Sequence, residues 1–135
     1  MNKSAKIIVG IVIIIVAIWL GYYVSNEQPI SGKTIKIGAI LPLSDSAAYY
    51  GNQAKMGIEI AKAEIIKDYP DMNFEIIYED SFYNPKGGVE AYNKLKNIDN
   101  VAAVITLASH VSLSILPLIN KDGVIQVGLA STAGK

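Results

Sequence analysis

The chain has 135 residues, with 12 Lys and Arg against 12 Asp and Glu, so its formal net charge at neutral pH is zero. A length of this order allows one domain. The balanced charge excludes a protein that binds nucleic acid mainly by neutralising phosphates, because such binding needs an excess of cations. The absence of cysteine excludes a disulfide scaffold and a thiolate metal site.

The N-terminal part of the chain has the pattern of a membrane-spanning helix. Residues 7–24 carry no charge, and as a helix these 18 residues would extend for roughly 27 Å, close to the hydrocarbon thickness of a bilayer. Lys3 and Lys6 precede this run and Glu27 is the first charge after it, which predicts that everything beyond the run is extracytoplasmic. We therefore expect residues 1–24 to form an uncleaved signal-anchor. A cleaved signal peptide is the alternative, in which case the domain is secreted or periplasmic instead of membrane-anchored.

Beyond a polar linker over residues 25–34, short apolar runs alternate with helical patterns. Strands are expected over residues 35–41, 74–79, 101–107 and 124–129, and helices over residues 52–69, from Pro85 to near Asn97, and from about His110 to Lys121. One face of the first helix is made of Ala54, Ile58, Ala61, Ile65 and Ile66. The third strand is almost entirely apolar, as is typical of a strand that is buried on both faces. This order predicts an α/β domain with a doubly wound parallel sheet and helices on both faces.

Two helix boundaries carry clear local signals. Asn84 followed by Pro85 is typical of a helix start, with Asn as the N-cap and Pro at the first helical position. Gly123 directly after Asp122 is typical of a helix end.

Parallel sheets of this kind bind ligands beyond the carboxyl ends of their strands, which here means residues 42–51, 80–84, 106–110 and 130–135. No G-x-G-x-x-G, Walker A or G-x-S-x-G pattern occurs in the chain, so we expect neither an enzyme nor a cofactor or metal site. The acidic pair Glu79-Asp80 lacks further acids at a suitable spacing, and we expect it to lie in a solvated loop or cap a turn. His110, the single histidine, is expected to be a solvated surface residue.

Hydroxyl and aromatic side chains are concentrated in these segments instead. Ser109 is expected to be the N-cap of the third helix, where backbone N–H groups and the helix dipole favour an anion such as a carboxylate. Two interpretations remain open at this point, because Ser109 either binds such a ligand or only caps its own helix. Tyr49 and Tyr50 could similarly wall a ligand site or pack within the first loop.

Three stretches of the chain together resemble a known family. The first is IKIGAILPLSDSAAYYGNQAKMGIEIA, which is similar to the opening of type I periplasmic solute-binding proteins of ABC transporters, and within them to leucine/isoleucine/valine-binding proteins. In these proteins an IKIG strand, a P-L-[ST]-G-like loop, a Y-G pair and a G-[IAV]-E-x-A helix follow one another, and this chain has Asp45 where the loop usually has Gly. The later stretches are YEDSFYNPKGGVEAYNKL and VAAVITLASHVSLSILPLINKDGVIQVGLASTA. The resemblance spans roughly residues 34–134.

The resemblance implies an extracytoplasmic protein that captures a small amino-acid-like ligand, such as a branched-chain amino acid, for import by an ABC permease in the membrane. Members of this family have two lobes and more than twice this length, so residues 35–135 would form the N-terminal part of the first lobe. The same fold also serves in sensory receptors. A ligand-sensing ectodomain of a membrane-anchored receptor is therefore the alternative function.

The resemblance also implies a set of ligand-binding residues, which are Ser109, Thr132, Ala130 and Tyr50. Ser109 would bind the α-carboxylate of the ligand, and Thr132 would add a hydroxyl contact to its carboxylate or amino group. Ala130 would contribute through its backbone, and the ring of Tyr50 would wall the pocket.

Overall fold

The computed structural model describes residues 14–19 and 34–132. The chain divides into two compact units, Met1–Ser31 and Gly32–Lys135. In the first unit, residues 14–19 are helical. Within the two described ranges, no helix combines the length and the apolar character that are needed to cross a membrane. The predicted signal-anchor and the linker after it lie mostly outside the described residues.

The second unit is built on a parallel sheet, which has four strands within the described residues, in the order β2-β1-β3-β4. Its strands are β1 (Ile35–Leu41), β2 (Phe74–Asp80), β3 (Ala103–Leu107) and β4 (Ile125–Leu129). Its helices are α2 (Ala48–Asp68), α3 (Pro85–Lys94) and α4 (Ser109–Asp122), with a short 3₁₀ turn η1 (Asp45–Ala47) and a π-helical turn η2 (Leu95–Asp99). The predicted doubly wound α/β arrangement is confirmed.

Local side-chain chemistry explains two of the helix boundaries. The side chain of Asn84 accepts a hydrogen bond of 2.8 Å from the backbone N–H of Gly87, and Pro85 occupies the first position of α3. Gly123 ends α4 with a φ of 64°, a left-handed conformation that glycine adopts without a steric penalty. Both signals in the sequence therefore predicted these boundaries correctly.

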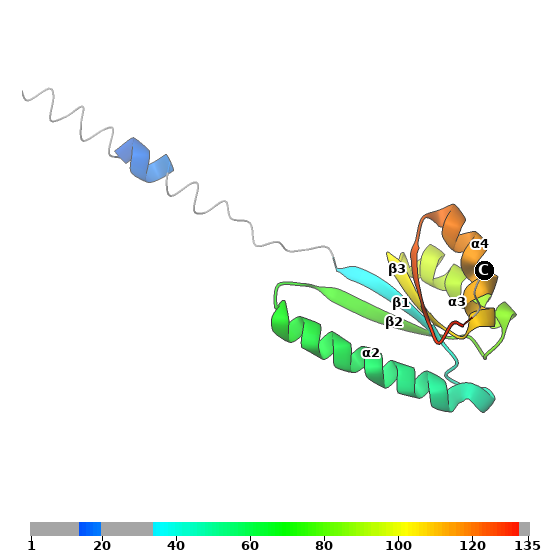
Figure 1. Cartoon of the computed structure of the whole chain (residues 1–135). Helices are drawn as coiled ribbons and strands as arrows, with labels where there is room; N and C mark the ends of the chain where they lie inside the picture. The colour runs from blue at the N-terminus through cyan, green and yellow to red at the C-terminus, as the bar shows by residue number, and fades with distance from the viewer. Residues whose placement is uncertain (1–13, 20–33, 133–135) are drawn as a thin grey trace, which may run out of the picture. The chain divides into compact units, whose positions relative to one another are not determined.

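The core lies between the sheet and the pair α3 and α4, while α2 covers the opposite face (Figure 1). Its largest fully buried side chains include Tyr92, Leu95, Ile115 and Val104. The hydroxyl of Tyr92 donates a hydrogen bond of 2.9 Å to Asp122 Oδ2, which ties α3 to the end of α4. Burial together with this carboxylate raises the pKa of Tyr92 to about 12.

The face of the sheet on the α2 side is only partly covered. On β4, Gln126 turns toward α4, so the neighbouring Ile125 and Val127 point to the other face, where they are 67% and 51% exposed. On β3, Val104 and Thr106 are buried, whereas Ala103, Ile105 and Leu107 are only half-buried. The prediction that the third strand is buried on both faces is thus wrong for the described residues, because one face of β3 keeps contact with solvent.

The apolar face of α2 shows the same partial cover. Ala54 and Ile58 are half-buried, while Ala61, Ile65 and Ile66 are exposed. The helix therefore rests on the sheet mainly through its N-terminal half. Within residues 34–132, part of the apolar surface of α2 and β4 is therefore exposed to solvent.

Candidate functional site

Unusual backbone geometry is concentrated at the carboxyl ends of the strands. Among the described residues, the non-glycine positions with positive φ are Asp45, Phe82, Tyr83, Asn100, Ala108 and Ala130. All of these except Asn100 follow the carboxyl end of a strand. Such conformations persist only where the surrounding structure fixes them, and they cluster at binding and catalytic sites. This edge of the sheet is therefore the candidate functional site.

The turn between β3 and α4 contains the residue with the largest positive φ of this set. Ala108 has φ 80° and ψ 140°, a region that residues with a Cβ rarely adopt and that costs about 1–3 kcal/mol. Ser109 follows it as the first residue of α4, and Ala108 itself is the N-cap. The prediction that Ser109 is the N-cap is therefore wrong, because the chain reaches helical geometry one residue earlier than the sequence suggested.

Two hydrogen bonds join this turn to the segment that follows β4. The backbone N–H of Ala108 donates to the carbonyl of Leu129 at 3.2 Å. The backbone N–H of Thr132 donates to Ser109 Oγ at 3.1 Å. Between these two contacts, Ala130 turns the chain with a φ of 48°. Ser109, Ala130 and Thr132, three of the four residues expected in the site, are thereby brought together.

Tyr50, the fourth expected residue, lies on the neighbouring loop. It belongs to the first turn of α2, after the carboxyl end of β1, and is 67% exposed. Its ring meets the ring of Tyr49 edge-on, with the ring centroids 5.6 Å apart. Tyr50 therefore stands at the same edge of the sheet as Ser109, and most of its surface is exposed.

Asp80 holds the loops of this edge together. Its Oδ1 accepts hydrogen bonds from the backbone N–H of Leu43 at 2.9 Å and of Phe82 at 2.8 Å, so it connects the loop after β1 to the turn after β2. Its neighbour Glu79 instead pairs with Lys94 at 2.6 Å. The expectation of a turn-capping role is confirmed for Asp80. Among the described residues, no group of three or more His, Asp or Glu side chains is arranged to hold a metal ion.

The charge of Asp80 predicts a pH-dependent stability. Burial opposes its charged form, but hydrogen bonds that include those from the backbone N–H groups of Phe82 and Leu43 outweigh burial and lower the pKa of Asp80 below its usual value. The stabilisation is therefore complete above the unfolded pKa of about 3.9 and is lost as the pH falls through the lower folded pKa. At pH 7 we expect Asp80→Asn to lower the free energy of unfolding by about 1–3 kcal/mol.

Urea denaturation at pH 7 and near pH 3 measures this effect. The difference between wild type and Asp80→Asn should shrink at the lower pH. Asp71→Asn removes the same charge from an exposed position and serves as the control. An Asp80→Asn effect that stays equal at both pH values would show that the charge of Asp80 does not provide the stabilisation.

His110 has partners that the sequence did not predict. Its ring meets the ring of Tyr83 edge-on, with centroids 4.6 Å apart, and its Nε2 lies 2.9 Å from the carbonyl oxygen of Tyr83. The residue is exposed, as expected, yet it also ties the turn after β2 to the first turn of α4. No local pattern in the sequence indicates this contact, because the two residues are 27 positions apart.

The chain matches a family of known proteins over most of its length. The family described as "Periplasmic binding protein" matches residues 34–135. The chain belongs to this family. A Leu/Ile/Val-binding protein of Rhizobium johnstonii is 32% identical over 108 residues, which are 78% of this chain and 29% of that protein. The predicted resemblance to type I periplasmic binding proteins of the leucine/isoleucine/valine-binding type is confirmed.

Solved structures of the same family have the same fold. A leucine-binding protein from Thermotoga maritima is 27% identical and superimposes with a TM-score of 0.66, over 74% of this chain and 29% of that one. A branched-chain amino acid transporter substrate-binding protein from Streptococcus pneumoniae, solved with isoleucine, is 25% identical with a TM-score of 0.66, over 71% of this chain and 28% of that one. The chain thus spans less than a third of the length of these relatives. The family consists of extracytoplasmic solute-binding proteins rather than enzymes.

Proposed function

We propose that this chain contributes to the solute-binding component of an ABC transporter, which captures a small amino-acid-like ligand, such as a branched-chain amino acid, for import. The observation that carries the proposal is the turn of Ala108 and Ser109 at the start of α4, joined to Thr132 at the carboxyl edge of the sheet. Relatives that bind leucine, isoleucine or valine support the class of ligand.

The proposed site binds the carboxylate of the ligand at the first turn of α4. Backbone N–H groups at a helix start and the helix dipole favour an anion there. A hydroxyl can both accept and donate, and Ser109 Oγ accepts from the backbone N–H of Thr132. Ala130 would supply a backbone contact, the Thr132 hydroxyl a further hydrogen bond, and Tyr50 an aromatic wall.

The organisation of the chain around this site is also a proposal. Residues 35–135 would be the N-terminal part of a first lobe, which requires further protein surface to enclose a ligand. Residues 1–24 would hold the domain at the membrane beside its permease, with residues 25–34 as the linker. The apolar run and its flanking charges support this arrangement.

Ser109→Ala tests the carboxylate role. We expect at least about a tenfold loss of affinity, because a charge-assisted hydrogen bond contributes about 1.5–3 kcal/mol. Isothermal titration of the intact protein with L-leucine, L-isoleucine and L-valine measures it. Ser114→Ala is the matched control, since Ser114 lies on the same helix but bonds to the carbonyls of Val111 and Pro85.

Two outcomes would contradict the proposal at different levels. A change of less than about twofold in Ser109→Ala, when the wild type binds, would remove the carboxylate role from Ser109. A wild-type protein that binds none of these amino acids would overturn the class of ligand.

A further inference from the structure

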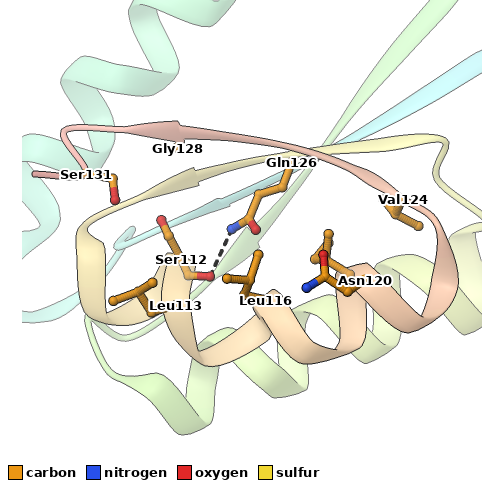
Figure 2. Close-up of a pocket in the computed structure, with 9 residues that line it drawn as sticks. Ser112, Leu113, Leu116, Asn120, Val124, Gln126, Gly128 and Ser131 are labelled. Atoms are coloured by element: carbon orange, nitrogen blue, oxygen red, sulfur yellow. Dashed lines mark hydrogen bonds between the residues drawn. The ribbon is translucent and has the colours of Figure 1, made fainter. Parts of the chain in front are cut away.

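A buried chain of polar side chains lies directly beneath the Ser109 turn. Thr106, the only polar side chain of β3, is fully buried, and Ser112 of α4 is 7% exposed. Thr106 Oγ1 and Ser112 Oγ lie 2.7 Å apart, and Ser112 Oγ donates to the carbonyl of Ala108 at 2.9 Å. From β4, Gln126 Nε2 donates to Thr106 Oγ1 at 3.2 Å and to the carbonyl of Ser112 at 3.0 Å. Figure 2 shows the bond from Gln126 to Ser112.

The number of hydroxyl and amide hydrogens determines the donor and the acceptor of each bond in this network. Ser112 has one hydroxyl hydrogen, and it points at the Ala108 carbonyl, so Ser112 Oγ must accept from Thr106. Thr106 has then used its own hydrogen, and its oxygen can accept from Gln126. The two hydrogens of the Gln126 amide are both used, one on Thr106 and one on Ser112. Each hydroxyl therefore donates once and accepts once.

This network of hydrogen bonds ends at the strained backbone of Ala108, the residue directly before Ser109. The Ala108 carbonyl accepts both the side-chain hydroxyl of Ser112 and its backbone N–H, the latter at 3.0 Å. The N–H of Ala108 is held in turn by Leu129. Both polar groups of this residue are thus fixed, as a backbone with φ 80° requires in order to persist.

We propose that Gln126, Thr106 and Ser112 are positioning residues, which hold the Ala108 peptide in its strained conformation and thereby preorganise the Ser109 turn for a carboxylate. This inference rests on the proposed function for its link to the ligand. Buried polar side chains are expensive unless every member is paired, and a valine would fill the Thr106 position equally well. A network in which both hydroxyls and both hydrogens of the Gln126 amide are paired offers what an apolar core does not, which is one defined orientation for the Ala108 carbonyl.

Gln126, at the outer end of the network, can be replaced without a steric clash. Gln126 and Ser112 line a cavity of about 450 Å³ between α4 and β4 (Figure 2). Gly128 lines the same cavity, and a Cβ at this position would lie 3.2 Å from Ser131 Cβ and 3.6 Å from Ser112 Oγ. Because Gln126 borders this space, a methionine of similar size can replace it while the two donors are lost.

Thr106→Val removes the central hydroxyl at nearly constant shape, and Thr106→Ser keeps the hydroxyl and serves as the conservative rescue. In ligand-free intact protein, amide hydrogen exchange of residues 108–112 should be at least about tenfold faster in Thr106→Val than in wild type, while the exchange of Val104 in the same strand changes with global stability only. Thr106→Ser should stay within about threefold of wild type in both regions. Titration with L-isoleucine should show a loss of at least about fivefold in Thr106→Val and recovery in Thr106→Ser.

Three results would overturn the proposal. One is unchanged exchange of residues 108–112 in Thr106→Val; another is faster exchange that is equal throughout the domain; the third is weakened isoleucine binding that Thr106→Ser does not restore. If Thr106→Val does not fold, Gln126→Met makes the same test from the half-buried end of the network. A wild type that binds no amino acid would contradict the proposed function alone, because the exchange measurement needs no ligand.

Discussion

Gly51→Ala is expected to lower the free energy of unfolding by about 3 kcal/mol or more, a large effect for the addition of one methyl group. A Cβ at position 51 would lie 1.8 Å from the carbonyl oxygen and 2.6 Å from the carbonyl carbon of Pro42. These are backbone atoms at the carboxyl end of β1, so they cannot rotate away as a flexible side chain would. Either α2 or the loop after β1 has to move.

Gly57→Ala is the matched control for this substitution. It lies in the same helix, and a Cβ there would meet nothing within 4 Å. We expect it to raise the free energy of unfolding by about 0.5–1 kcal/mol, because alanine loses less backbone entropy than glycine in a helix. Urea denaturation followed by circular dichroism measures both variants. Equal effects would show that α2 does not approach Pro42 closely.

The same close approach has a meaning for the candidate site. Tyr50 precedes Gly51 in the first turn of α2, so the contact between Gly51 and Pro42 sets where the Tyr50 ring stands. A displaced helix start would move this ring away from the carboxyl edge of the sheet. Gly51 thus belongs to the scaffold of the proposed ligand wall.

Gly38 and Leu95 should show strong coupling in a double-mutant cycle. Leu95 is fully buried, and Leu95→Ala is expected to cost about 2–4 kcal/mol, because it leaves a cavity. A Cβ at position 38 would lie 2.6 Å from Leu95 Cδ1, so Gly38→Ala overfills the core and should cost about 1–3 kcal/mol. In the double variant, the methyl group of residue 38 enters the space that the leucine has left. We expect the double variant to be more stable than the sum of the single effects by at least about 1 kcal/mol.

Chemical denaturation of the four proteins of the cycle gives the coupling energy. Gly57→Ala combined with Leu95→Ala should be additive, because the new methyl group of residue 57 touches nothing. Additivity in the Gly38 and Leu95 cycle as well would contradict the packing of Leu95 over β1.

Much of the fold could be predicted because its signals are local. β1 runs over Ile35–Leu41 as expected, since an apolar run closed by Pro42 defines a strand from nearby residues alone. Asn84 and Pro85 likewise carry the start of α3 within a few positions. By contrast, α2 begins at Ala48, four residues before the predicted Asn52. The preceding 3₁₀ turn leads directly into α2 without a side-chain cap, so no capping residue in the sequence indicates where this helix begins.

The rest depended on contacts between distant positions. The exposed face of β3 follows from which elements cover it, and an apolar composition cannot reveal that. Ser109, Ala130 and Thr132 were expected together through the resemblance to a family, and the structure places them together, while their role toward a ligand stays a prediction. The network beneath Ser109 links residues that are 6, 14 and 20 positions apart. Its one trace in the sequence is Thr106, a hydroxyl in an otherwise apolar strand.

The partly covered sheet has a consequence for how such a protein is made. Within residues 34–132, β4 lies at one edge of the sheet, and its outward backbone groups stand beside the apolar side chains of Ile125 and Val127. An open edge next to an apolar face is a template to which another strand can be added, either from the same polypeptide or from another protein. During synthesis, we expect this partly covered layer to favour aggregation until another element or another protein shields it.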